Sequence, residues 1–144
     1  MAENVKGLKW HKFLIYFGLW ASGIFALVSG LFQLTVMNEI QFFPTWLTMS
    51  YGVAVIIWGC YCIYVRFQLA GFKKNAPQKF LLSMLAYAII QLAFIVISSL
   101  SLGLPPGEVI PVVAPTLIGW VIGTGIVYWI HKTYYDNRKD LFDK

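Results

Sequence analysis

The sequence predicts an all-α integral membrane protein: a four-helix bundle that crosses the bilayer four times, with both chain ends in the cytoplasm. Hydrophobic residues make up 59% of the chain and charged residues only 12%, whereas soluble domains have about 25% charged residues. Lys and Arg are confined to three short segments, residues 1–12, 66–79 and 132–144, which alternate with four apolar stretches. Because short cytoplasmic loops collect Lys and Arg, this alternation predicts which helix ends lie inside the cell.

The four apolar stretches have the length of transmembrane helices. We place the spans near residues 13–34, 46–65, 80–102 and 112–130, since a hydrocarbon core of ~30 Å needs about 20 helical residues. The first span exceeds the ~7–15 apolar residues of a signal peptide, so we expect it to stay in the mature protein. The other segments are too short for a soluble domain. Residues 1–144 are therefore predicted to form a single transmembrane domain.

The connections between spans carry the signals that end and start helices. The first outer loop holds Glu39 and no base, and Pro44 suits the first turn of the second helix. In the inner loop, Gly71 indicates a helix stop and Pro77 a restart. Residues 103–115 contain four prolines and are not expected to form a regular helix interior. They are predicted to be a stiff linker or a lid that dips into the membrane interface.

Small residues stand four positions apart in the first and last spans. They are Gly18, Ser22, Ala26 and Gly30 in the first and Gly119 and Gly123 in the last. Small side chains let helix backbones approach closely, which drives helix association in lipid. We predict that the first set is buried against the second or fourth span, with Leu19, Phe25 and Phe32 outside the contact. Both sets serve packing within the bundle or an interface with another copy or a partner.

The membrane interior is predicted to be free of ionisable groups, because no span contains Asp, Glu, Lys, Arg or His. Transporters coupled to ions or protons generally need such groups inside the membrane. Gln91 is the polar side chain nearest the centre of a span, and we predict an interhelical hydrogen bond for it. The alternative is a substrate or ion path lined by Gln91 and small hydroxyls.

No residue pattern in the sequence points to catalysis, a cofactor or a metal. His11 and His131 have no carboxylate or thiol beside them, so both are predicted to be interfacial residues. Cys60 and Cys62 point in different directions on a helix and lie near its cytoplasmic end, which argues against a disulfide. The spans lack the acid–base pair or metal constellation of an intramembrane enzyme. We therefore expect a protein that is not an enzyme.

The basic segments are predicted to orient the chain and to contact anionic lipid headgroups. Nucleic acid is not an expected partner, although the net charge is +5, because the bases lie next to the predicted membrane surface. In the tail, Lys132 and Asp136 favour a helix at their four-residue spacing, whereas Asp136 and Asp140 oppose it. We expect a short, frayed extension, anchored at the inner interface by Tyr134, Tyr135, Leu141 and Phe142. Residues 137–144 of this tail are predicted to be dispensable for folding.

Three segments carry a resemblance to known proteins: residues 9–17 (KWHKFLIYF), 64–77 (YVRFQLAGFKKNAP) and 138–142 (RKDLF). They resemble functionally uncharacterised small four-span integral membrane proteins of anaerobic gut bacteria, and the resemblance extends over the whole chain. The matching residues are juxtamembrane anchors, and the group has no assigned activity. The resemblance therefore implies the fold but no catalytic residue.

The function expected from these patterns is that of a non-enzymatic component of the cell membrane, acting through helix contacts with itself or a larger membrane partner. The alternative is a minimal oligomeric transporter or channel for an uncharged or small solute, because four packed helices enclose little space. Small four-helix multidrug transporters have a similar length, but they use a Glu in the first span, where this chain offers Ser22, Ser29 and Gln33.

Overall fold

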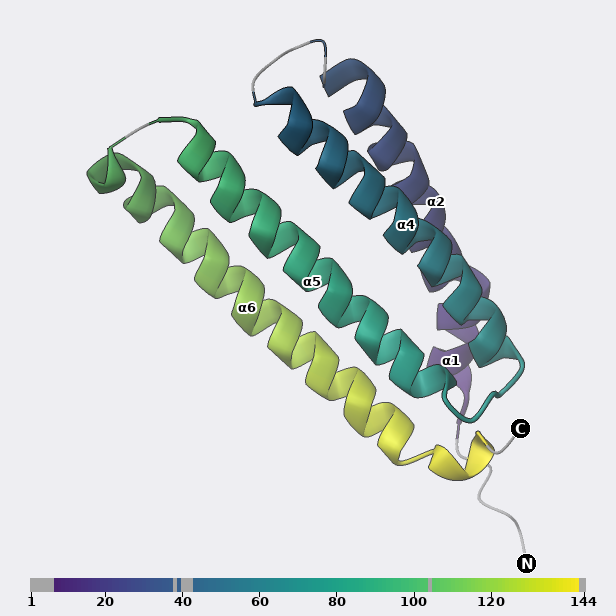
Figure 1. Cartoon of the computed structure of the whole chain (residues 1–144). Coiled ribbons are helices and arrows are strands. Elements are labelled where there is room, and N and C mark those ends of the chain that lie inside the picture. Colours follow the sequence, from purple (N-terminus) through teal and green to yellow (C-terminus); the bar gives the residue numbers. More distant parts are fainter. Residues whose placement is uncertain (1–6, 38, 40–42, 104, 143–144) are drawn as a thin grey trace, which may run out of the picture.

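Four long helices build the molecule, and a computed structural model describes residues 7–37, 39, 43–103 and 105–142. The described residues contain no strand. In chain order (Figure 1), the elements are α1 (Lys9–Phe13), the π-helical η1 (Leu14–Gly18), α2 (Leu19–Phe32), the π-helical η2 (Gln33–Met37), α4 (Thr45–Ala70), α5 (Ala76–Ser101), α6 (Pro106–Asp136) and the short 3-10 helix η3 (Lys139–Leu141). The elements from α1 to η2 follow one another without a break, so they count as one long helix.

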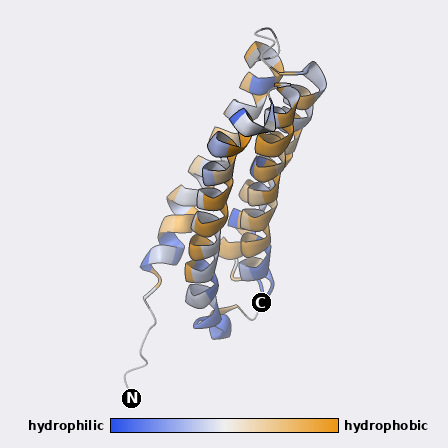
Figure 2. Ribbon diagram, turned by 90° about the vertical axis from the view of Figure 1, so that its left-hand side faces the viewer, coloured by the Kyte–Doolittle hydropathy of each residue, from blue (hydrophilic) through white to orange (hydrophobic). Residues whose placement is uncertain are grey.

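The structure confirms the predicted all-α fold with four helices. Four helical segments are long and apolar enough to cross a membrane: Lys9–Val36, Thr45–Ala70, Ala76–Ser101 and Val113–Asp136. Each contains most of one predicted span and extends beyond it at one end or both. Hydrophilic residues lie at both ends of the bundle, and the long middle stretches are mostly hydrophobic (Figure 2).

The helix boundaries follow the local signals in the sequence. The carbonyl of Pro44 accepts hydrogen bonds from the N–H groups of Leu47 at 2.9 Å and Thr48 at 3.3 Å. Pro44 thus directly precedes α4 rather than lying in its first turn. Gly71 follows the last residue of α4, and Pro77 lies in the first turn of α5. The predicted stop and restart are confirmed.

The prediction for residues 103–115 was wrong, because most of this segment belongs to a helix. Gly103 makes the turn after α5 with a left-handed φ of +64°, a conformation that favours glycine. Helix α6 then begins at Pro106 and continues through Pro111 and Pro115. These two prolines lie four residues apart, so their rings fall on neighbouring positions of one helix face, and both are exposed. Each removes a single N–H donor, and this loss did not prevent a helix.

The helices pack in the order of the chain: α2 lies on α4, α4 on α5, and α5 on α6. Helix α6 is at the edge of this row, next to α5 (Figure 1). Within Val113–Asp136, none of the described residues in the most apolar 18-residue stretch is buried. The four helices thus leave one face of α6 without a neighbour along the apolar length.

The buried hydrophobic core cluster lies at the end of the molecule where the first helix meets the tail. It combines the start of the first helix, the end of α4, the start of α5 and the tail, with members such as Ile15, Val65, Leu69, Phe80 and Tyr135. Three regions that are far apart in sequence, the start of the first helix, the α4–α5 connection and the tail, are therefore held together at this end.

The tail belongs to this cluster, so the predicted frayed extension was wrong. Phe142 is only 5% exposed, and its ring centroid lies 5.5 Å from those of His11 and Phe72. Asp136 pairs with Lys132 at 2.6 Å and with Lys139 at 3.2 Å. The second lysine offsets the charge repulsion expected between Asp136 and Asp140, and the chain turns back after α6.

Candidate functional site

Glycines bring α2 and α4 into backbone contact at two levels. A Cβ atom added to Gly30 would lie 2.8 Å from the carbonyl oxygen of Gly52, and one added to Gly52 would lie 3.0 Å from that of Gly30. Gly23 and Gly59 are related in the same reciprocal way, at 3.2 and 3.0 Å. Ala26 lies between these levels and is 2% exposed. The backbones of this antiparallel pair are therefore in close contact at both levels.

The contact face of α2 is rotated from the predicted one. Ala26 and Gly30 are buried as predicted, but Ser22 is exposed and Gly18 is half-buried. Leu19, which was expected outside the contact, is 4% exposed. Four residues turn a helix by about 400°, so each step of four drifts about 40° past a full turn. Alternating steps of four and three, from Leu19 to Gly23, Ala26 and Gly30, remain on one face.

Phe25 and Phe32 lie outside this contact, as predicted. Their side chains are 73% and 48% exposed. Large apolar side chains with this exposure suit a lipid environment rather than water.

Gly119 and Gly123 of α6 have no partner helix among the described residues. A Cβ atom added to either glycine would have no heavy atom within 4 Å, apart from its own helix and chain neighbours. Ile122 and Ile126, which share this helix face by their spacing, are 57% and 54% exposed. Packing of these glycines inside the bundle was therefore a wrong prediction, and an interface with another chain stays a prediction.

Gln91 has the interhelical hydrogen bond that the sequence predicted. Its Nε2 donates to the hydroxyl of Tyr51 on α4 at 2.8 Å, and the Tyr51 ring stacks on Phe94 at 4.0 Å. A second bridge joins the same helices, where Trp58 Nε1 donates to the carbonyl of Ser83 at 2.8 Å. Sequence reasoning missed Tyr51 and Trp58 as partners, because spacing along one helix says nothing about the facing residue on another.

The two histidines are buried, which corrects the interfacial positions predicted for them. His11 is 1% exposed; its backbone N–H donates to the Tyr134 hydroxyl at 3.2 Å, and its Nδ1 lies 3.3 Å from the Tyr135 hydroxyl. His131 is 7% exposed and its Nδ1 donates to the carbonyl of Val127 at 2.8 Å. The fold covers both with aromatic rings from elsewhere in the chain, which no local pattern indicates.

Two grooves mark the surface of the bundle. The first, which we call the lateral groove, has a volume of about 260 Å³ and is lined mainly by apolar side chains, with Ser22, Ser83 and His131 as polar members. Gly18 also lines it, so two of the residues predicted to face a helix border this groove instead. The second, which we call the basic groove, has a volume of about 600 Å³ and includes Lys74, Lys132 and Lys139 in its lining.

Neither groove brings together a metal-ligand set. The described residues contain no group of three or more His, Cys, Asp or Glu side chains placed to hold a metal ion. Cys60 is exposed and Cys62 is buried, and both are free thiols.

Comparisons with protein-family models, curated proteins and solved structures found no match for this chain. The resemblance to small four-span proteins of gut bacteria therefore stays a prediction. The open face of α6 and the two grooves are the candidate functional surfaces that the described residues present.

Proposed function

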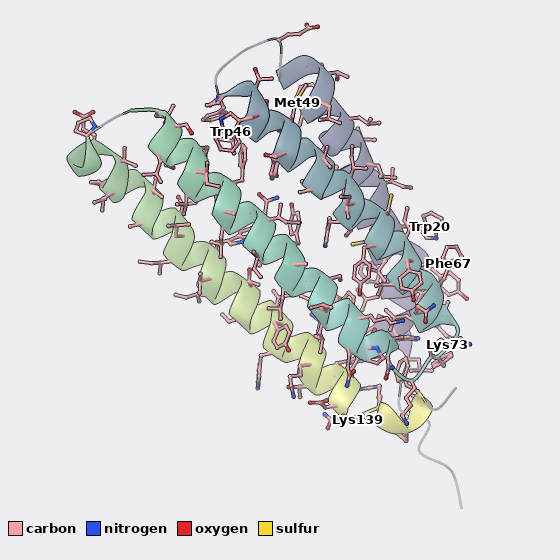
Figure 3. All side chains as sticks on the ribbon, in the orientation of Figure 1. Trp20, Trp46, Met49, Phe67, Lys73 and Lys139 are labelled. Atoms are coloured by element: carbon pink, nitrogen blue, oxygen red, sulfur yellow. The ribbon has the colours of Figure 1, made fainter. Side chains whose placement is uncertain are left out.

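We propose that this protein is a non-enzymatic, four-span component of the cell membrane that acts through contacts between α6 and the α6 of a second copy. The arrangement of charge supports the orientation, with both chain ends in the cytoplasm. Lys73 and Lys139 lie at one end of the bundle and Trp46 at the other (Figure 3). Lysines from two of the three basic segments thus lie at one end, which suits the positive-inside rule.

The observation that carries this proposal is the open glycine face of α6. This chain uses glycines to bring α2 and α4 into backbone contact, with added Cβ atoms only 2.8 to 3.2 Å from facing carbonyl oxygens. Gly119 and Gly123 have the same capacity for close approach, but a Cβ atom added to either would meet no heavy atom of another described element within 4 Å. In lipid, helices associate through such small residues because apolar side chains gain little from leaving the lipid.

A second copy is the occupant that fits this face best. A two-fold axis would place Gly119 and Gly123 of one α6 against the same residues of the other, which gives a closed, self-complementary contact. The flanking Ile122 and Ile126 side chains are exposed and would pack beside the glycines. The result would be a dimer of four-span subunits.

The dimer is testable by counting subunits in lipid vesicles at low protein density, for example by single-molecule photobleaching of labelled protein. Wild-type protein is expected to bleach mainly in two steps, and Gly123→Leu mainly in one. Gly125→Leu is the matched control, because Gly125 also has open space around it but lies about 200° around the helix from Gly123. A monomeric wild type, or an intact Gly123→Leu dimer, would overturn the proposal.

The lateral groove favours a second candidate function, a minimal transporter or channel for a small uncharged solute. It places Ser22 and His131 among the apolar side chains of Trp10, Trp58 and Phe80. Filling the groove by Ser22→Leu should then abolish glycerol or urea flux into vesicles that contain the protein. If vesicles with the wild-type protein show the same flux as protein-free vesicles, this candidate is eliminated.

A further inference from the structure

The basic groove lies between α5 and α6, at the end of the molecule that holds the buried core cluster. Its polar rim comes from three separate places in the sequence: Lys74 in the loop before α5, Lys132 on α6 and Lys139 in η3. The bases were predicted to touch lipid headgroups only as a general surface property. In the structure three of them converge on one concavity.

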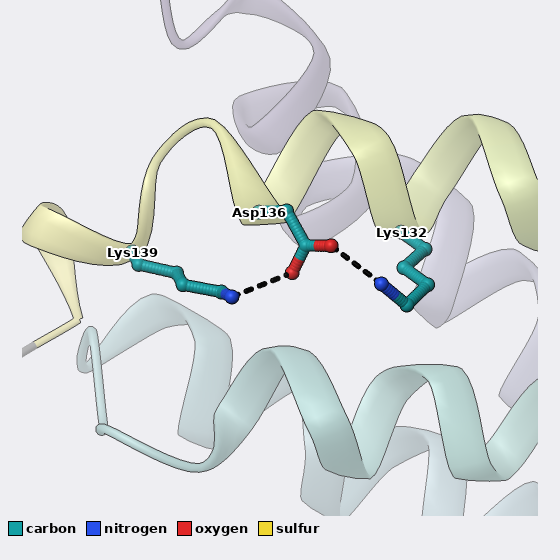
Figure 4. Close-up of polar contacts among 3 residues, drawn as sticks. All are labelled: Lys132, Asp136 and Lys139. Atoms are coloured by element: carbon teal, nitrogen blue, oxygen red, sulfur yellow. Dashed lines mark hydrogen bonds and ion pairs between the residues drawn. The ribbon is translucent and has the colours of Figure 1, made fainter.

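Asp136 holds two of these lysines in place without neutralising the groove. Its Oδ2 accepts from Lys132 Nζ at 2.6 Å, and its Oδ1 pairs with Lys139 Nζ at 3.2 Å (Figure 4). Three ammonium groups face one carboxylate in the lining, which leaves an excess of two positive charges. Each ammonium has three N–H donors, so both paired lysines keep donors for a ligand.

The start of α5 adds to the positive character of the same groove. Asn75 and Gln78 line it, and within the described residues no side chain caps this helix end and no acidic residue lies in its first turn. The first N–H groups of a helix lack intrahelical acceptors and carry the positive end of the helix dipole. Ala76 donates its N–H to the Lys73 carbonyl at 2.9 Å and Pro77 has no N–H, so this helix end favours a phosphate group through its dipole rather than through a set of free N–H donors.

The apolar part of the groove identifies the class of ligand. Leu81, Leu82 and Leu85 follow Gln78 along α5 and line the same concavity. Leu82 is 59% exposed and Leu85 is 39% exposed, so an acyl chain can lie on them. A free phosphate ion would contact the lysines only, whereas a phospholipid has both an anionic head and an apolar chain.

We propose that the basic groove binds one anionic phospholipid, with its phosphate among Lys74, Lys132 and Lys139 and an acyl chain along Leu82 and Leu85. Basic pockets between transmembrane helices on the cytoplasmic side are suited to anionic headgroups. The site rests on the proposed membrane location, with the groove at the inner leaflet. It does not rest on dimerisation through α6.

The test is a titration of the full-length protein in an uncharged detergent, followed by native mass spectrometry. The probes are dioctanoyl-phosphatidylglycerol, dioctanoyl-phosphatidylcholine and inorganic phosphate. One phosphatidylglycerol is expected to bind per chain, at least 10-fold more tightly than phosphatidylcholine or phosphate. Equal affinity for the two lipids would overturn the proposal, and phosphate binding as tight as phosphatidylglycerol would show a site for a free anion instead.

Two pairs of substitutions with the same charge change separate the groove from general surface charge. Lys74→Gln with Lys139→Gln removes two groove lysines but keeps the Lys132–Asp136 pair, and should weaken phosphatidylglycerol binding by about 10- to 30-fold. Lys9→Gln with Lys12→Gln alters two exposed lysines outside the groove and should change binding less than about 2-fold. Equal weakening by both pairs would contradict the site.

A third variant tests the acyl-chain wall. Leu82→Asn alters an exposed position and should weaken phosphatidylglycerol binding while leaving phosphate binding unchanged. Unchanged lipid binding would remove the acyl-chain part of the proposal. Repeating the titration with Gly123→Leu separates this site from the proposed dimer, because a monomer that still binds lipid leaves the groove intact and tells only against self-association.

Discussion

Replacing Gly30 with Ala should destabilise the fold, although Ala favours helices over Gly. The added Cβ would lie 2.8 Å from the carbonyl oxygen of Gly52 and 2.5 Å from Cγ1 of Ile56. Ordinary contact of a Cβ atom begins at 3.4 Å, so α2 and α4 must separate by about 0.6 Å at this level. The obstacle is the main chain of a packed helix, which cannot rotate away as a side chain can.

The expected net cost is about 2 kcal/mol. Overpacking a close contact costs ~1–3 kcal/mol, and the backbone clash places Gly30→Ala near the upper end. A gap of ~0.5–1 Å also forfeits a quarter to a half of the dispersion energy of the atoms that it separates. Against this, Ala gains about 1 kcal/mol over Gly inside a helix.

The assay is reversible unfolding in mixed detergent micelles, followed by circular dichroism. Gly125→Ala is the matched control, because a Cβ atom there meets nothing within 4 Å. This control should be as stable as the wild type or gain up to ~1 kcal/mol. If Gly30→Ala is as stable as Gly125→Ala, the backbone contact between α2 and α4 does not exist as described.

Two further predictions concern the bridge between α4 and α5 and the buried tail. A double-mutant cycle of Gln91→Leu and Tyr51→Phe should give a coupling energy of about 0.5–1.5 kcal/mol in the same unfolding assay, since it removes one hydrogen bond in an apolar setting; zero coupling would show that the 2.8 Å contact contributes nothing. Phe142→Ala should cost roughly 3–5 kcal/mol because the ring is 5% exposed, and deleting residues 137–144 should cost at least as much. A stable deletion variant would restore the expectation of a dispensable tail.

The number of helices and most of their ends could be predicted from the sequence, because these features depend on local chemistry. A span needs a long apolar run wherever it lies in the chain, and Gly71 and Pro77 act on the backbone at their own positions. The prolines of α6 were misread, because the rule against proline inside a helix treats each proline alone. Helix α6 begins at Pro106 and contains Pro111 and Pro115. The hydrogen bonds of its other residues outweigh the two N–H donors that these prolines remove.

The contact faces could be predicted only in part. The small residues of the first span indicated a close helix contact, and Ala26 and Gly30 lie in it. A strict four-residue step selects Ser22 instead of Gly23, because it ignores the rotation of about 40° beyond a full turn that each such step adds. The partner of Gln91 was hidden for another reason: Tyr51 is 40 positions away in the sequence, and only the packing of α4 on α5 brings the two together.

The buried cluster around His11 and Phe142 could not be predicted at all from local patterns. Tyr134, Tyr135 and Phe142 reach His11 across more than 120 positions of sequence. A histidine or phenylalanine in a basic segment looks like an interfacial residue until the loop after α4 and the tail are seen to cover it. The basic groove depends on the same closure, since Lys74 meets Lys132 and Lys139 only in the folded chain.

The central claim, that the chain crosses the membrane four times with its basic end in the cytoplasm, is tested most directly by labelling single cysteines with a membrane-impermeant maleimide. In a background with Cys60→Ala and Cys62→Ala, Glu39→Cys and Glu108→Cys should react in intact cells, because both positions are exposed at the end opposite the basic segments. Lys74→Cys and Lys139→Cys should react only after permeabilisation. Reaction of Lys74→Cys in intact cells would contradict this topology.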